Sequence, residues 1–281
     1  MPHRPSASPR SSALLALVVL LTAVPALTNN APSRLSSPGE IRKEFESVPC
    51  EDKDRLAAVK ALFEKAGASP ANIRVEHYAD VENLVVVKPG ASTDKIVIGA
   101  HYDKTSLGCG AVDNWTGQVA ISHLYQTLRD VPLEKTLVFV AFGREEKGLV
   151  GSKAMTRAIA DGQVAEYCAM VNIDSLGLGP PQVADNMSSK ALAAFTGEMA
   201  KAMEIPFAHA GIGRANSDSS SFVARKIPAV TIHGLDDAWA RILHSGRDQA
   251  SKVNAANVYL GYRLALGMVA RLDRAACDAY R

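Results

Sequence analysis

The sequence predicts a single α/β domain built on a mixed, mainly parallel β-sheet with helices on both faces. Residues 136–142, 169–173 and 229–232 form continuous apolar runs, and stretches with apolar residues at helical spacing lie between them. Strands that are apolar on both faces are typical of parallel sheets covered by helices. No internal repeat of about 20 to 50 residues is present in the sequence, which excludes solenoids and propellers.

The expected elements follow one another along the chain. In order, we expect a helix at 40–66 that ends before Gly67, strands at 84–87 and 96–98, a helix at 115–128, a strand at 136–142, a helix at 149–159, a strand at 169–173, helices at 190–203 and 219–224, a strand at 229–232 and a closing helix at 254–271. Ligands of such sheets bind beyond the carboxyl ends of the strands. The polar residues that follow the strands are therefore the candidates for function.

The first thirty residues are interpreted as an export signal rather than as part of the fold. A basic stretch precedes the apolar run 13–21, and small residues suited to a cleavage site follow it. The run is shorter than the roughly 20 residues that a membrane-spanning helix needs, so we expect no stable membrane insertion; an uncleaved anchor is the alternative. We therefore expect a secreted or periplasmic protein. Its expected parts are a signal peptide at 1–30, a linker at 31–39 and a folded domain at 40–281.

The charge balance argues against nucleic acid as a partner. The chain has 31 basic and 29 acidic residues, a formal net charge of +2, and no block of like charge. Proteins that bind nucleic acid through electrostatics usually carry a basic patch or tail. We therefore expect no nucleic-acid partner.

The chain contains four cysteines, and none of them forms a C-x-x-C pair. A cysteine zinc site or a redox motif is therefore not expected, whereas an even number of cysteines in an exported protein favours disulfides. Three pairings are possible. Because chain ends of compact domains often lie close together, we expect Cys50 to pair with Cys277 and Cys109 with Cys168; free buried thiols are the alternative.

Histidines and acids gather just beyond the expected strands and at the start of the helix at 115–128. These residues are His101, Asp103, Asp113, Glu145, Glu146, Asp174, His233 and His244. Zinc takes imidazole and carboxylate ligands, and two adjacent ions need a carboxylate that bridges them. Each residue alone has a structural alternative, such as a helix N-cap for an aspartate. Their shared position at one edge of the sheet favours a metal site.

The motifs around these residues resemble those of the co-catalytic zinc aminopeptidases, the twenty-eighth metallopeptidase family. The resemblance extends over about 84–248. The matching segments are His101-Tyr102-Asp103, the run Gly-Ala-Val-Asp-Asn-Trp-Thr-Gly at 110–117, the run Glu-Glu-Lys-Gly-Leu-Val-Gly-Ser at 145–152, Asn172-Ile173-Asp174, and the run Ile-Leu-His-Ser-Gly-Arg-Asp at 242–248. The family often has Ser-Asp-His where this chain has Ser217-Asp218-Ser219, so its substrate wall is expected to differ.

The resemblance implies two zinc ions and assigns a ligand set to them. Asp113 would bridge both ions. His101 and Asp174 would complete one site, and Glu146 and His244 would complete the other. The family's fold is a single α/β globule with a mixed sheet, which agrees with the pattern of strands and helices.

The same resemblance implies the roles of the neighbouring residues. Glu145 would be the general base, and Asp103 would accept the second ring N–H of His101. A cis peptide would join Asp113 to Asn114. For the last ligand, His244 is preferred over His233, because His244 lies within the closing motif whereas His233 ends an apolar run.

The function implied is that of a secreted aminopeptidase, which removes N-terminal residues from peptides with a free N-terminus. A hydroxide bridging the metals would attack the scissile carbonyl, with Glu145 as the base. The alternatives are a glutaminyl cyclase acting on N-terminal Gln, a carboxypeptidase or aminoacylase of a related clan, and a non-catalytic binding ectodomain. The candidates for a pocket wall are Trp115, Phe207, Phe222 and Trp239.

Overall fold

The computed structural model describes residue 1, residues 34–213 and residues 215–281. The signal peptide expected at 1–30 and the start of the expected linker lie outside the residues described from 34 onward. From residue 34 the chain forms one compact unit. Its first helix begins at Pro38, two residues before the expected domain boundary. Every helix in the described part of the chain is too short or too polar to cross a bilayer.

An eight-stranded mixed sheet forms the centre of this unit, with the strand order β1-β2-β4-β3-β5-β8-β6-β7. The strands are β1 (Ile73–Tyr78), β2 (Val81–Lys88), β3 (Lys95–His101), β4 (Thr136–Phe142), β5 (Tyr167–Ile173), β6 (Gln182–Ala184), β7 (Ala208–Ala210) and β8 (Ala229–His233). The central strands β4, β3, β5 and β8 run parallel to one another. Antiparallel pairings join β2 to β1 and β4, and β6 to β8. The predicted mixed, mainly parallel sheet is confirmed.

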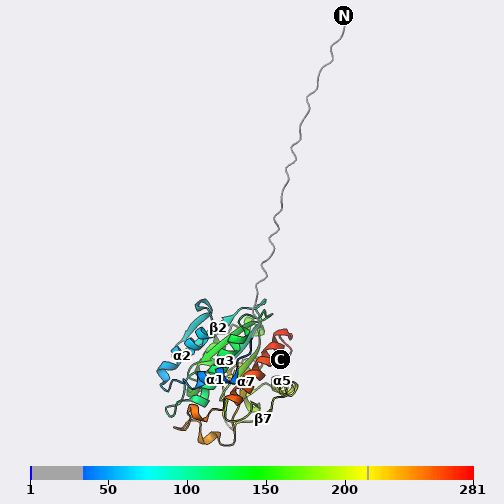
Figure 1. Cartoon of the computed structure of the whole chain (residues 1–281). Coiled ribbons are helices and arrows are strands. Elements are labelled where there is room, and N and C mark those ends of the chain that lie inside the picture. The colour runs from blue at the N-terminus through cyan, green and yellow to red at the C-terminus, as the bar shows by residue number, and fades with distance from the viewer. Residues whose placement is uncertain (2–33, 214) are drawn as a thin grey trace. The chain divides into compact units, whose positions relative to one another are not determined.

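Helices cover both faces of the sheet (Figure 1). The first face carries α1 (Pro38–Phe45), α2 (Asp52–Lys65), α3 (Thr116–Leu128), α5 (Lys190–Ala202) and α7 (Ala255–Arg274), and the second carries α4 (Val150–Ala158) and α6 (Ser219–Ala224). Successive residues of a strand point to opposite faces. In β4, Phe139 accordingly packs in the first layer and Val138 and Val140 pack in the second. This is why the strands read as continuous apolar runs.

The helix expected at 40–66 is in fact two helices, α1 and α2. Pro49 lies between them, and proline both lacks the N–H that a helix needs and disfavours helical geometry in the residue before it. At the other end of α1, Ser37 and Glu40 form a capping box that fixes its first turn. The short or edge strands β1, β6 and β7 were not expected, because their residues lack a run of buried apolar side chains.

The predicted cysteine pairing is wrong. Cys50 is bonded to Cys109, with Cα atoms 4.1 Å apart, and Cys168 is bonded to Cys277, with Cα atoms 4.4 Å apart. None of the four cysteines, all of which lie in the described part of the chain, is free. Arg55 of α2 donates to the carbonyl of Cys109 at 2.9 Å, which holds the start of α2 against the loop that precedes α3. The chain end instead packs beside the start of β5, where Arg281 donates to the carbonyl of Tyr167 at 2.8 Å.

Candidate metal centre

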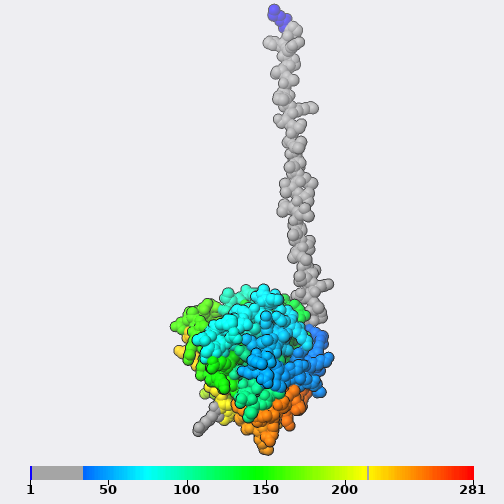
Figure 2. All heavy atoms as spheres, turned by 90° about the vertical axis from the view of Figure 1, so that its left-hand side faces the viewer, coloured from blue at the N-terminus to red at the C-terminus, as the bar shows by residue number. Residues whose placement is uncertain are grey.

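The parallel strands place the candidate residues at one edge of the sheet. His101 is the last residue of β3, and Asp174 directly follows β5. Glu145 and Glu146 form a turn of 3₁₀-helix three residues after β4. Asp113 lies in the turn that leads into α3. His244 comes from the segment between β8 and α7, which forms one end of the folded unit (orange in Figure 2).

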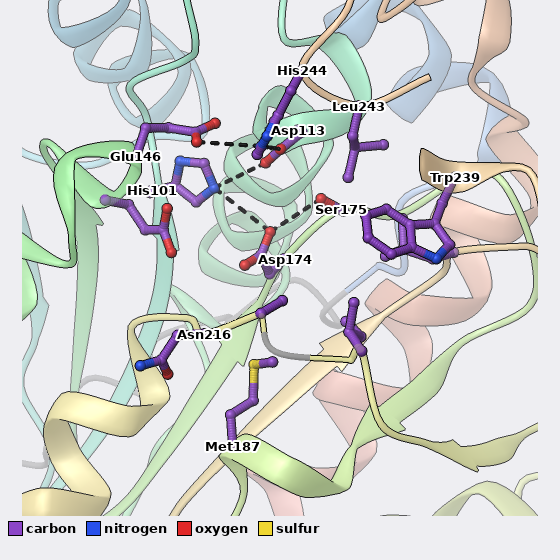
Figure 3. A pocket seen from close by; sticks show the side chains of 14 residues that line it. His101, Asp113, Glu146, Asp174, Ser175, Met187, Asn216, Trp239, Leu243 and His244 are labelled. Carbon is purple, nitrogen blue, oxygen red and sulfur yellow. Dashed lines mark hydrogen bonds and ion pairs between the residues drawn. The ribbon is translucent and has the colours of Figure 1, made fainter. Parts of the chain in front are cut away.

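Asp113 lies between two histidines, and each of its carboxylate oxygens faces one of them (Figure 3). Oδ1 is 3.1 Å from Nε2 of His101, and Oδ2 is 3.0 Å from Nε2 of His244. An oxygen of Asp174 lies 3.6 Å from Nε2 of His101, and an oxygen of Glu146 lies 3.3 Å from Nε2 of His244. The five residues expected as ligands therefore come together in space.

These residues form two groups that share Asp113 and suit a metal ion. One group is His101, Asp113 and Asp174, the other is Asp113, Glu146 and His244, and within each group the donor atoms all lie within 4.8 Å of one another. Oε1 of Glu146 is buried and has no hydrogen-bond partner among the described residues, as expected of an oxygen that serves as a metal ligand. A third group contains Cys168 and Cys277, whose sulfurs are joined to each other and are not available as ligands.

The crowding of buried carboxylates shifts the pKa values of the centre. Burial, reinforced by the charge of Asp113, raises the pKa of Glu146 to about 7. Burial and the charges of neighbouring acids raise the pKa of Glu145 well above its usual range. The hydrogen bond to Asp113 raises the pKa of His244 to about 9 although burial opposes it. A bound cation would relieve this repulsion between the carboxylates.

Asp248 and Asn114 hold Asp113 in place. The carboxylate of Asp248 accepts the N–H groups of Val112 and Asp113 at 2.7 and 3.1 Å. The side chain of Asn114 donates to the carbonyl of Ile173 at 2.9 Å, which ties the turn to the end of β5. The peptide bond between Asp113 and Asn114 is cis, as the resemblance implied. The positioning role of Asn114 was not predicted, although the residue lies within a quoted motif.

Asp103 accepts the second ring N–H of His101 through its main-chain oxygen and not through its carboxylate. Nδ1 of His101 lies 3.1 Å from the main-chain oxygen of Asp103 and 3.6 Å from its carboxylate, which is too far for a hydrogen bond. The carboxylate instead accepts the main-chain N–H groups of Glu145 and Glu146 at 2.9 and 3.1 Å. The turn after β4 presents these two main-chain N–H groups to Asp103, so its carboxylate orients the segment that carries both glutamates.

Ser217 is a site residue whose contact was not predicted. Its hydroxyl donates to Asp174 at 2.6 Å and accepts from the side chain of Asn172 at 2.7 Å. The only signal was the pair Ser217-Asp218, which marked a departure from the family pattern. Ser219, at the departing position, is buried and donates to the carbonyl of Met187 at 2.8 Å instead of facing the centre.

His233 lies outside both groups. Its side chain is buried, and its Nδ1 accepts the N–H of Leu235 at 3.3 Å. Burial lowers the pKa of His233 to about 4, so the ring is neutral at pH 7. The structure therefore places His244, rather than His233, beside Asp113 and Glu146.

An apolar wall faces the acids and histidines across the same pocket (Figure 3). It is formed by Met187, Ile212, Leu235, Trp239 and Leu243. Of the four aromatic residues considered from the sequence, only Trp239 lines this pocket. Trp115 and Phe222 belong to the hydrophobic core, and Phe207 packs against it.

The model of peptidase family M28 matches residues 83–266, more than half of the chain. The chain belongs to peptidase family M28. This confirms the family predicted from the motifs, and the matched region contains every residue of the two donor groups.

Curated relatives of this chain are named as aminopeptidases. Aminopeptidase YwaD of Bacillus subtilis is 32% identical over 99 residues, which cover 34% of this chain and 22% of the relative. A probable leucine aminopeptidase of Trichophyton verrucosum is 27% identical over 249 residues, which cover 77% of this chain and 66% of the relative. The chain thus spans less than two thirds of the length of these curated relatives.

Solved structures of an aminopeptidase and of a glutaminyl cyclase share this fold. The Legionella pneumophila LapA aminopeptidase superposes with a TM-score of 0.72 at 20% identity, covering 85% of this chain and 69% of that one. An Acidobacteriales bacterium glutaminyl cyclase superposes with a TM-score of 0.74 at 17% identity, covering 90% of this chain and 99% of that one. At these identities the likeness establishes the fold alone.

Proposed function

We propose that this protein is a two-zinc aminopeptidase that removes N-terminal residues from peptides. The observation that carries the proposal is the position of Asp113, which offers one carboxylate oxygen to the His101 side and the other to the His244 side. A bridging carboxylate of this kind is what two adjacent metal ions require. Family membership and the names of the curated relatives support a peptidase that acts at N-termini.

The donors of both groups suit zinc, which takes imidazole nitrogens and carboxylate oxygens. His101, Asp113 and Asp174 would hold one ion, and Asp113, Glu146 and His244 would hold the other. Two zinc ions bound there would polarise the scissile carbonyl and lower the pKa of a water molecule toward neutrality. The three-ligand groups leave coordination positions open, as catalytic zinc sites do.

Glu145 is proposed as the general base. It lines the pocket beside Glu146 but belongs to neither donor group. Burial raises its pKa above the usual range for a glutamate, which makes its carboxylate a stronger proton acceptor. Its carboxylate would take the proton of the attacking water and give it to the leaving nitrogen as the C–N bond breaks. Asp103 would keep Glu145 in place through its main-chain N–H.

The remaining parts of the pocket would select the substrate. The apolar side chains of Met187, Trp239 and Leu243 offer a wall for the side chain of the N-terminal residue. A free substrate α-amine would bind one of the zinc ions, which would favour peptides with a free N-terminus.

We further propose that the protein is exported, with a signal peptide at 1–30 and the folded domain following the linker. The two disulfides support this proposal, because such bonds persist in oxidising compartments. An N-terminal sequence of the protein recovered from outside the cytoplasm would test it. Recovery only from the cytoplasm, with the first thirty residues retained, would contradict it.

The proposed activity is tested by measuring zinc content together with turnover of a panel of aminoacyl anilides. We expect two zinc ions per chain, and turnover that a chelator abolishes and added zinc restores. A glutaminyl cyclase structure superposes on 90% of this chain, so cyclisation of a peptide with N-terminal Gln is measured in parallel. Cyclisation without anilide turnover would replace the aminopeptidase by a cyclase. If the zinc-loaded protein shows neither anilide turnover nor cyclisation, a non-catalytic binding role is favoured.

A further inference from the structure

A second pocket lies beside the first, between α4 and α6. We call it the α4–α6 groove; its α4 side includes Leu149, Lys153 and Arg157, and its α6 side includes Asn216 and Arg225. Its volume of about 400 Å³ falls within the range of small-ligand pockets. None of the residues assigned to metal binding or to proton transfer lines this groove.

The groove is continuous with the candidate metal centre. Asn216 lines both pockets, and Figure 3 shows it near the start of α6, across the pocket from Trp239. On the α4 side, the N–H of Leu149 donates to the carbonyl of Glu145 at 2.8 Å, so the groove begins next to the proposed general base. A peptide whose first side chain lies against Trp239 therefore has the groove as a path for the residues that follow.

The groove is positively charged. Its described lining contains three cations, Lys153, Arg157 and Arg225, and no acid. Arg225 is paired with Asp161, so the net charge comes from Lys153 and Arg157, both of which are exposed. In the first pocket, two divalent ions would balance the four carboxylates of Asp113, Glu145, Glu146 and Asp174. The cations of the groove would then be the unbalanced charge along the path of the substrate.

The spacing of these cations sets the length of peptide that reaches them. A helix rises about 1.5 Å per residue, so Lys153 lies about 6 Å and Arg157 about 12 Å along α4 from Leu149. An extended peptide advances about 3.3 to 3.6 Å per residue. A carboxylate about two residues beyond the scissile bond would lie beside Lys153, and one about four residues beyond it would lie beside Arg157.

We propose that the α4–α6 groove binds the part of the substrate that follows the scissile bond, and that Lys153 and Arg157 bind a carboxylate there. The inference rests on the proposed aminopeptidase function and specifies its substrates as short or acidic peptides. The carboxylate has two possible sources: the C-terminus of a short peptide, or an acidic side chain a few residues after the scissile bond.

The test compares four substrates with the zinc-loaded protein: Leu-Ala-Ala as free acid, its C-terminal amide, amidated Leu-Ala-Glu, and a leucyl anilide. The variant is the double substitution Lys153→Gln with Arg157→Gln. We expect the ratio of kcat/KM for the free acid to that for the amide to fall about 2- to 5-fold, mainly through KM, because the carboxylate of the tripeptide lies beside Lys153 and one exposed charge contributes roughly this much. High salt should shrink the same ratio in the wild type, because exposed charges are screened.

Two control variants separate charge from local structure. Lys153→Arg keeps the charge beside the tripeptide carboxylate and should retain most of the wild-type ratio. Lys201→Gln removes an exposed cation from α5, outside both pockets, and should leave the ratio unchanged. A loss confined to amidated Leu-Ala-Glu would assign the carboxylate to the side chain, and a loss confined to the free acid would assign it to the C-terminus. Equal ratios in the wild type and the double variant would overturn the proposal.

A binding measurement tests the proposed role of the groove independently of the proposed catalytic activity. Calorimetry measures the Kd of Leu-Ala-Ala with an N-methylated scissile amide, as free acid and as amide, with the wild type and the double variant. Tighter binding of the free acid to the wild type alone supports the groove even if the anilide is not hydrolysed. Turnover of the anilide combined with equal Kd values for acid and amide would refute the groove and leave the aminopeptidase proposal intact.

Discussion

The carboxylate of Asp103 accepts the main-chain N–H of Glu145 at 2.9 Å. Its second oxygen accepts the N–H of Glu146 at 3.1 Å, so one side chain orients both the proposed base and a proposed ligand. The main-chain oxygen of the same residue faces Nδ1 of His101 at 3.1 Å. Asp103 thus links the ends of β3 and β4 without belonging to either donor group.

Asp103→Asn should lower kcat by about 10- to 100-fold, the usual effect of losing a residue that orients metal ligands. An asparagine of the same shape presents an NH₂ group to one of the two N–H donors, which displaces the glutamate turn. We expect KM for a leucyl anilide to change less than kcat. Asp185→Asn, at an exposed aspartate paired with His209, is the matched control and should keep wild-type turnover. Wild-type kcat in the Asp103 variant would remove this positioning role.

Glu145→Gln should lower turnover by about 10² to 10⁴-fold while both zinc ions remain bound. The amide keeps the size of the side chain but cannot carry the proton, and Glu145 is in neither donor group. Anilide turnover and zinc content are measured on the same preparation. Loss of zinc together with activity would indicate that Glu145 is a ligand, and a variant with a tenth or more of wild-type turnover would refute the role of base.

Asp113→Asn should release more zinc than a change at any other proposed ligand. Asp113 is shared by both groups, whereas Asp174 and His244 each belong to one. Competition with a chromophoric chelator would measure zinc affinity in Asp113→Asn and Asp174→Asn. We expect both ions to be weakened in the first variant and one in the second. If the Asp113 variant held one ion as tightly as the wild type, Asp113 would not be the bridge.

The two disulfides should differ in their effect on the metal centre. Removing either one, by a pair of Cys→Ala substitutions, should lower the free energy of unfolding by roughly 2 to 5 kcal/mol. Cys109 lies on the loop that leads to Asp113, and Arg55 binds its carbonyl. Cys168 and Cys277 join the start of β5 to the chain end, on the opposite end of β5 from Asp174. Loss of the Cys50–Cys109 bond alone should therefore also weaken zinc binding, as measured by chelator competition.

His233 should make the fold less stable at low pH. Burial lowers its pKa to about 4, whereas an unfolded histidine has a pKa near 6.5. Below about pH 6.5 the unfolded chain binds a proton that the folded ring does not bind, so the free energy of unfolding falls until about pH 4. The whole effect is about 3 kcal/mol. Urea unfolding between pH 7 and 4 should show a shallower decline in His233→Asn than in the wild type, and identical slopes would contradict the buried neutral ring.

The alternation of apolar runs and helical segments predicted the sheet and its covering helices, because these patterns are local. Residues such as His101 and Asp174 were found for the same reason, since each directly follows a buried strand. The polar strand β1 and the break at Pro49 were missed. An edge strand carries no continuous apolar run, and the apolar spacing of a helix continues across a short interruption.

Strand ends and short motifs can be read along the chain, and they were enough to predict the fold class, the family and the ligand candidates. Which distant residues contact one another could be read only from the folded structure. The bond between Cys50 and Cys109 occurs where Arg55 of α2 contacts the loop before α3. The carboxylate of Asp103 contacts the N–H groups that the turn after β4 presents to it. Such contacts join residues 42 to 59 positions apart in the chain. Tertiary packing sets their geometry, and local sequence patterns do not predict that packing.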